Sequence, residues 1–193
     1  DIDIPIIGLL RHIQICFKWG APLFSTIAEL SQNELEEYYL KAKNGWTTYA
    51  VQALFGYGAS FGGKWFAGYA RGGVNSNGEP RNHLSETLRN LEKLAPKIKG
   101  VEFRVGSYNS FNYGEGNVIY CDIPYGYGKP VTKYKHGAFD YDKFFDWARG
   151  QSLVNHVYIS EYDAPDDFEI IWEKEHKSGI HHGTEHKKTV ERL

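Results

Sequence analysis

The sequence predicts an α/β fold in which helices cover a largely parallel sheet, with one mainly helical insertion. Up to about residue 100 the apolar residues repeat with helical periodicity, and beyond it short apolar runs alternate with one further helical pattern. Such alternation is typical of βαβ units, which build parallel sheets. A tract rich in glycine and aromatic residues, 46–81, interrupts the helical part and is expected to be the insertion.

Composition narrows the classes of protein that fit. A chain of 193 residues, 41% of them hydrophobic, can bury one sizeable core. The formal net charge of -2 excludes a protein that coats nucleic acid through overall positive charge, so any DNA contact must come from one face. Cys16 and Cys121 predict reduced thiols in a cytoplasmic protein, with a disulfide as the less favoured alternative. Because no apolar run approaches the roughly 20 residues that span a bilayer, we expect no membrane contact.

Three helices are expected in the first half of the chain. The first opens near Pro5 and continues through apolar residues as far as Ile13. The second begins with a capping box, in which the side chains of Ser31 and Glu34 each accept a hydrogen bond from the backbone N–H of the other residue. The third covers residues 82–94, with leucines on one side and a proline two residues beyond its end.

The second half predicts strands around one helix. This helix is expected from Asp140, whose side chain can cap it, to Arg149, with Gly150 ending it. The last two strands are expected to pair with each other in antiparallel fashion. The predicted strands are Val101–Val105, Asn117–Cys121, Val154–Ser160, Phe168–Trp172 and Thr189–Leu193.

The most informative segment is Asp122-Ile123-Pro124-Tyr125, which follows an apolar strand. Open α/β sheets bind their ligands at the carboxyl ends of their strands. A carboxylate there can accept hydrogen bonds from an amine, a proline stiffens the turn, and a ring offers a face to a planar base. These are the demands of chemistry on a nucleobase flipped out of a duplex. An ordinary turn after a strand is the alternative, since Asp and Pro are common in turns for backbone reasons.

The tetrapeptide resembles the Asp-Pro-Pro-Tyr motif of DNA adenine methyltransferases, and other segments match the same family. Residues 54–71 are similar to the distinctive tract of its phage-encoded, Dam-like members. Residues 160–168 and 172–175 are similar to their C-terminal pattern, and residues 1–5 resemble the acidic segment after their second strand. The resemblance implies a Rossmann-like methyltransferase sheet and an enzyme of a bacterial or phage-infected cell.

The resemblance also implies a role for each residue of the motif. Asp122 and the carbonyl of Ile123 would accept hydrogen bonds from the exocyclic amine of a flipped adenine in double-stranded DNA. Tyr125 would stack on the base, and Pro124 would shape the loop. The amine would attack the methyl group of S-adenosylmethionine, and no metal is expected. Ile123 replaces the family's proline, which keeps the carbonyl but loosens the loop.

Cofactor contacts are implied at Asp1, Ser107 and Tyr108. Asp1 resembles the acid that binds the ribose hydroxyls, with a frayed terminal residue as the alternative, and Ser107 stands where relatives place an acid. In the family a glycine-rich loop precedes the acidic segment, so we expect this chain to be the larger, C-terminal part of an enzyme, without the first strand and that loop. The expected parts are a cofactor-side segment (1–44), a target-recognition insertion (45–95) and a catalytic part (96–193).

DNA contacts are expected from cations and rings in or beside the insertion. Trp65 could instead pack the insertion's own core, and Lys64 could be merely solvated. Basic residues at 129–136 could line the same DNA path, although surface charge alone explains them almost as well. The expected DNA-binding residues are Lys64, Trp65, Tyr69, Arg71 and Arg81.

Two clusters could suggest a metal, and for both we favour a simpler interpretation. The histidines at 176, 181, 182 and 186 lie in a polar turn without the spacing typical of zinc ligands. The acids from Glu161 to Asp167 are more simply a capped turn.

Two rival functions remain open. A catalytically silent DNA-binding relic is suggested by Ile123 and Ser107. A methyltransferase acting on an amine of RNA or protein is the other, since the tetrapeptide also occurs in such enzymes.

Overall fold

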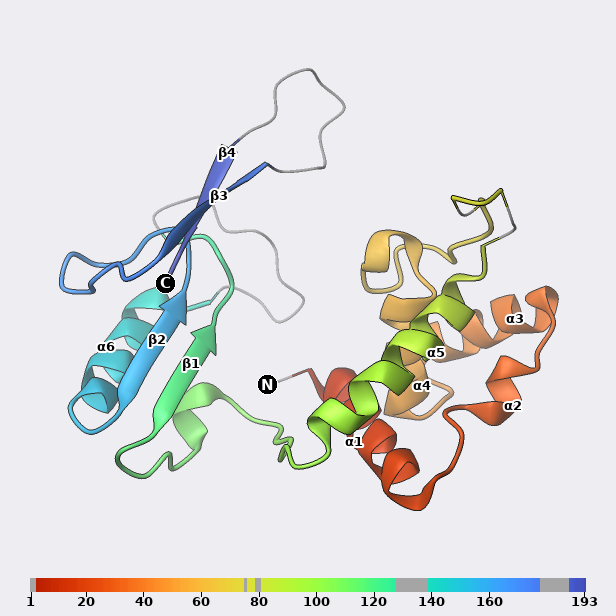
Figure 1. The fold of residues 1–193 in the computed structure, drawn as a ribbon, viewed down its shortest axis with the longest axis horizontal. Helices are drawn as coiled ribbons and strands as arrows, with labels where there is room; N and C mark the ends of the chain where they lie inside the picture. Colours follow the sequence, from red (N-terminus) through yellow and green to blue (C-terminus); the bar gives the residue numbers. More distant parts are fainter. Residues whose placement is uncertain (1–2, 75, 79–80, 128–138, 178–187) are drawn as a thin grey trace. The chain divides into compact units, whose positions relative to one another are not determined.

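The computed structural model describes residues 3–74, 76–78, 81–127, 139–177 and 188–193. The chain forms two compact units, residues 1–110 and residues 111–193 (Figure 1). We call them the helical unit and the sheet unit. No helix in these described ranges has the length and apolarity needed to cross a membrane.

Local signals in the sequence explain where the helices of the helical unit begin and end. Helix α1 starts after Asp3, whose carboxylate accepts the Ile6 N–H at 3.2 Å, and it ends at Gly20, which adopts the left-handed conformation. Helix α3 begins with the predicted capping box of Ser31 and Glu34. The helices are α1 (Ile4–Trp19), α2 (Ser25–Ala28), α3 (Gln32–Lys43), α4 (Tyr49–Ala53) and α5 (His83–Leu94), with shorter helical turns η1 (Leu54–Gly58), η2 (Phe61–Gly63), η3 (Ala95–Ile98) and η4 (Tyr108–Ser110).

One apolar core joins the helices of this unit. Ile13 of α1 and Leu54 and Phe55 of η1 are fully buried, and residues of α3, α4 and α5 belong to the same cluster. The expected insertion therefore shares its core with the segment that precedes it. Gly56 permits part of this packing, because a β-carbon there would lie 2.5 Å from the ring of Trp65.

The sheet unit is built on one βαβ unit. Strand β1 (Val118–Asp122) pairs in parallel with β2 (His156–Ser160), and α6 (Tyr141–Ser152) connects them and lies alongside (Figure 1). Asp140 caps α6 by accepting the Lys143 N–H at 3.0 Å. The α6 residues Phe144, Phe145 and Ala148 are buried, as the sequence predicts.

A C-terminal hairpin completes the sheet unit. Strand β3 (Glu173–Lys177) pairs antiparallel with β4 (Lys188–Arg192). An isolated bridge between Glu161 and Arg192 joins β4 to the residue that follows β2.

Most of the predicted elements are confirmed, and two strands are wrong. Residues 101–105 form no strand, because their carbonyls bond to side chains instead of to another strand: Arg11 donates to the Phe103 carbonyl and Gln14 to the Val101 carbonyl. Residues 168–172 are not a strand either, since the N–H groups of 171 and 172 both bond to the carbonyl of Leu193 and the ladder begins at Glu173. Helix α6 also continues past Gly150. The described parallel sheet has two strands, so the wider Rossmann-like sheet stays a prediction.

Candidate active site at the carboxyl ends of the parallel strands

The register of the parallel strands brings two strand ends together. Asp122, the last residue of β1, is the Cα partner of Ser160, the last residue of β2. Parallel strands place their carboxyl ends at the same edge, so the loop after Asp122 and the loop after Ser160 start side by side. This edge is where α/β sheets bind ligands.

The first half of the predicted motif presents an acid on a fixed loop. The Asp122 side chain is exposed, and within the described part of the chain it makes no hydrogen bond or ion pair. The Ile123 side chain is buried at 8% exposure and anchors the loop. The carbonyl of Pro124 accepts a hydrogen bond of 2.7 Å from the hydroxyl of Tyr141, which ties the loop to the first turn of α6. The carboxylate thus stands on a held backbone, open to an incoming donor.

Tyr125 is held from two other elements. Its hydroxyl donates to Glu191 of β4 at 2.9 Å and lies 2.6 Å from the hydroxyl of Ser160. Its ring meets that of Tyr162 edge to face, with centroids 4.9 Å apart. Burial raises the pKa of this phenol, and the charges of Glu191 and Asp122 raise it further against an opposing hydrogen bond from Ser160. Tyr125 is therefore a neutral, fixed ring at ordinary pH, suited to stacking rather than to proton transfer.

Glu161 is a buried carboxylate that locks the two loops together. It is 2% exposed, and both of its oxygens accept the N–H of Gly126 at 3.0 Å. One oxygen also accepts the N–H of Tyr162 at 2.6 Å. Bonds from backbone N–H groups stabilise a buried charge, which would otherwise be costly to remove from water. Glu161 fixes the residue directly after the tetrapeptide.

The C-terminal hairpin reaches the same cluster. One oxygen of Glu191 accepts hydrogen bonds from both Tyr125 and Ser160. Arg192 donates to the carbonyl of Tyr162 at 2.9 Å and lies 3.5 Å from Asp163. The position of Tyr125 consequently depends on β4 as well as on β1 and β2.

Sequence reasoning missed several members of this cluster. Ser160, Glu161, Tyr141 and Glu191 had no assigned role at the motif. The register of two parallel strands would have been a usable signal for Ser160 and Glu161, because they follow β2 as the tetrapeptide follows β1. Glu191 could not be found in this way, since its contact depends on how the hairpin packs.

The acids after β2 bind separate partners. Arg192 lies near Asp163, and Arg149 donates to Asp167 at 2.6 Å. Among the described residues, no group of three or more His, Cys, Asp or Glu side chains gathers as metal ligands do. The sequence positions 181, 182 and 186 lie outside the described residues, as do 129–136.

The predicted cofactor residues are not brought into one site by the described geometry. Asp1 lies outside the described residues. Ser107 is exposed, and its carbonyl accepts hydrogen bonds from the backbone and hydroxyl of Ser110. Tyr108 begins the η4 turn and is half-buried. Both belong to the helical unit, and the S-adenosylmethionine assignment stays a prediction.

The predicted DNA-binding rings are largely engaged within the helical unit. Trp65 packs against Tyr57 and Phe66, with centroid distances of 4.8 and 4.7 Å, so the alternative that it fills the core fits the geometry. The hydroxyl of Tyr69 accepts a hydrogen bond of 2.9 Å from Gln32. These two rings support the fold of the tract.

The predicted DNA-binding cations differ from one another. Lys64 is exposed just after η2. Arg71 forms an ion pair with Glu36, and Arg81 donates to Glu86 at 3.0 Å. A neighbouring carboxylate thus already neutralises each arginine.

Comparison of the chain with protein-family models, with curated proteins and with solved structures finds no match. The functional argument therefore depends on the residues and their geometry.

Proposed function

We propose that this chain acts as a site-specific DNA adenine methyltransferase that uses S-adenosylmethionine. The observation that supports this most directly is the exposed carboxylate of Asp122 at the end of a parallel strand, three residues before the held ring of Tyr125. A carboxylate and a neighbouring ring on one ordered loop meet the two needs of adenine recognition, an acceptor for the amine and a flat apolar surface for the base.

The residues of the site would orient the adenine. The Asp122 carboxylate and the Ile123 carbonyl would accept the two N–H groups of the exocyclic amine, which directs the nitrogen lone pair outward. Tyr125 would stack on the base. S-adenosylmethionine, when bound, supplies the electrophilic methyl group. Because Glu161, Tyr141 and Glu191 already hold this loop, little ordering remains to be done when the base enters, and such preorganisation contributes much of the rate enhancement in transfer reactions.

The decisive experiment measures transfer of a labelled methyl group to adenine-containing duplex DNA. It uses this chain with labelled S-adenosylmethionine. We expect Asp122→Asn to lower the rate by about 100-fold, because a charged acceptor positioned at the reacting amine contributes on the order of 3 kcal/mol. Asp166→Asn, another exposed aspartate of the sheet unit, is the matched control and should change the rate by less than about twofold.

Each rival predicts a different result. A silent DNA-binding relic would bind duplex without transferring label. An enzyme of RNA or protein would label those substrates and leave duplex DNA unlabelled. Transfer to DNA that is equally fast in Asp122→Asn would remove Asp122 from the site and contradict the proposal.

A further inference from the structure

Helix α5 has an apolar face and a basic face. Leu84 and Leu88 are buried in the core of the helical unit, together with Ala95 just beyond the helix. At 100° per residue, Arg89 and Lys93 lie on the opposite side, and both are exposed. Lys97, in the η3 turn that continues α5, is exposed as well. Arg89, Lys93 and Lys97 are called the α5 basic row below.

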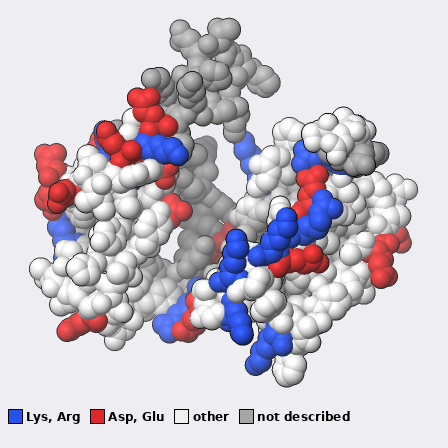
Figure 2. Space-filling model, viewed as in Figure 1, with Lys and Arg blue, Asp and Glu red and all other residues white. Residues whose placement is uncertain are grey.

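The row has regular spacing. Its members are separated by four residues each, which corresponds to about 6 Å per step along a helix and about 12 Å in total. One strand of duplex DNA presents a phosphate about every 3.4 Å along the helix axis, so the row covers the length of about four phosphates. Figure 2 shows Lys and Arg side chains along the course of α5 on the face in view, with acidic side chains between some of them.

The charges of the row are available to a ligand. Among the residues that the structure describes, no carboxylate forms an ion pair with Arg89, Lys93 or Lys97. The acid on the same face, Glu86, is bound by Arg81, which lowers its pKa most, and the charge of Arg89 lowers it further without forming an ion pair. Glu92 is exposed beside the row without pairing to it. The row therefore differs from Arg71 and Arg81, whose charges are already neutralised.

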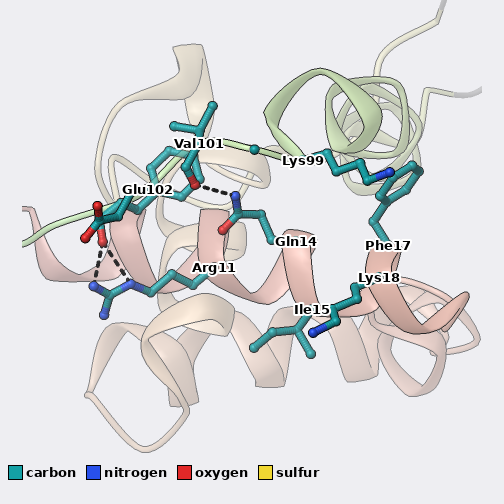
Figure 3. A pocket seen from close by; sticks show the side chains of 10 residues that line it. Arg11, Gln14, Ile15, Phe17, Lys18, Lys99, Val101 and Glu102 are labelled. Atoms are coloured by element: carbon teal, nitrogen blue, oxygen red, sulfur yellow. Dashed lines mark hydrogen bonds between the residues drawn. The ribbon is translucent and has the colours of Figure 1, made fainter.

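The helical unit has a groove whose lining includes Lys99, two residues after Lys97, the last member of the row. The groove has a volume of about 900 Å³ and is lined by α1 residues and by residues 99–103. Gln14 holds one wall by donating to the carbonyls of Ile98 and Val101, at 2.6 and 2.7 Å. Lys18 and Lys99 add two exposed cations to the lining (Figure 3). The groove thus extends the positive charge beyond η3.

We propose that the α5 basic row, extended by Lys18 and Lys99 at the groove, binds the phosphate backbone of duplex DNA. The identification of the ligand as DNA rests on the proposed function. The position of the basic surface is argued from the structure alone. A membrane surface is disfavoured by the helix itself, because membrane-binding helices expose a broad apolar face and the apolar face of α5 is taken up by the core. Within residues 81–100, all described, no large hydrophobic side chain is exposed, whereas the groove exposes Ile15, Phe17 and Val101. A membrane is therefore disfavoured for the row, and the vesicle experiment below tests the groove.

The test compares two triple variants that remove the same charge. Arg89→Ala, Lys93→Ala and Lys97→Ala together remove the row. The matched control combines Lys43→Ala, Lys143→Ala and Lys174→Ala, all at exposed positions on other elements. Fluorescence anisotropy with a labelled 20-base-pair duplex, without cofactor, gives the dissociation constant at several salt concentrations. Circular dichroism melting checks that both variants are folded.

We expect the row variant to bind duplex at least tenfold more weakly at 0.1 M salt. The logarithm of the association constant, plotted against the logarithm of the salt concentration, should have a slope that is shallower by about 3. Each lost phosphate contact reduces the magnitude of this slope by about 0.9. The control variant should change the dissociation constant by less than about threefold. Equal losses in the two variants, or an unchanged row variant, would overturn the proposal. Row-dependent binding to vesicles of anionic lipid with none to duplex would overturn it in favour of a membrane.

The two proposals fail separately in this design. Asp122→Asn should lose methyl transfer, and its binding to duplex should still weaken when the row is removed. Row-dependent binding without any transfer would contradict the enzyme and leave the DNA-binding surface in place. If the row variant transfers methyl groups and binds duplex as wild type does, the proposed DNA-binding surface is contradicted and the proposed enzymatic function is not.

Discussion

The two units of the chain use burial differently. The helical unit buries aliphatic and aromatic side chains of helices α1 to α5 and of the turns η1 and η3 in one core, and it turns the cations of α5 to solvent. The sheet unit also buries Phe144 and Phe145, but it keeps Asn155, Ser160 and Glu161 inside as well, whereas Ser60 is the one buried polar residue among the described residues of the helical unit. Buried polar groups are costly unless they are satisfied, so their position at the strand ends indicates that they serve geometry there. The comparison separates a region stabilised by packing from one whose loops are fixed by hydrogen bonds.

The largest effect is expected from the core of the helical unit. Phe55 is 0% exposed, and Phe55→Ala should lower the free energy of unfolding by about 3–5 kcal/mol, because it removes a buried ring and leaves a cavity. Phe61→Ala, at a phenylalanine that is 73% exposed, is the control and should cost less than about 0.5 kcal/mol. Urea unfolding followed by circular dichroism measures both. Similar values for the two variants would contradict a core centred on η1.

A smaller effect, confined to the other unit, is expected at Glu161. Glu161→Ala leaves the N–H groups of Gly126 and Tyr162 without their acceptor and should lower the free energy of unfolding by about 2–3 kcal/mol. Hydrogen exchange should show lost protection at Gly126 and in β1 and β2, with α1 unaffected. The exposed Glu169→Ala is the matched control. Protection at Gly126 that survives the substitution would show that another group holds this loop.

Tyr125 allows the roles of ring and hydroxyl to be separated. Tyr125→Phe removes the bonds to Ser160 and Glu191 and should cost about 1 kcal/mol of stability, while methyl transfer stays within a few-fold of wild type. Tyr125→Ala should abolish transfer, because the stacking surface is lost. Tyr158→Phe, at a more exposed tyrosine of β2, serves as the control. If the phenylalanine variant is as inactive as the alanine variant, the hydroxyl and not the ring is the essential group.

The smallest effect concerns pH. Burial raises the pKa of the Cys121 thiol from its ordinary value of 9.0 to about 11. The folded state thus prefers the neutral thiol, and this contribution to stability is complete below about pH 9 and is lost as the pH rises toward 11. The stability difference between wild type and Cys121→Ser should shift by about 1 kcal/mol between pH 8 and about pH 9.7, to the disadvantage of wild type. A difference independent of pH would mean that the thiol is accessible to water.

Alkylation tests the same environment. Burial raises the pKa of both thiols, and only the thiolate reacts, so iodoacetamide at pH 8 should label Cys16 and Cys121 slowly in the folded chain and readily in urea. Rapid labelling of Cys121 in the folded protein would indicate that the end of β1 opens.

Short sequence motifs predict much of the local structure. Asp140, the Ser31 and Glu34 capping box and the spacing of leucines in α5 each act within one or two turns of helix, so helices α1, α3, α5 and α6 are predictable from the chain alone. The short apolar runs of β1 and β2 are predictable for the same reason, and so is their parallel pairing, because the intervening helix requires a crossover. The position of Asp122 and Tyr125 after β1 follows directly.

Tertiary structure decided what depends on a distant partner. In residues 101–105 apolar and polar side chains alternate as in a strand, but this alternation does not specify a partner strand. The side chains of Arg11 and Gln14 instead donate hydrogen bonds to carbonyls of this segment. Trp65 and Tyr69 looked like exposed rings and became part of the helical unit's packing, while Arg71 and Arg81 met carboxylates. The bonds of Glu191 to Tyr125 and of Glu161 to Gly126 arise from contacts between segments far apart in the sequence. Sequence periodicity reports which face of an element is apolar, whereas the partner of a polar group is fixed only when the elements pack.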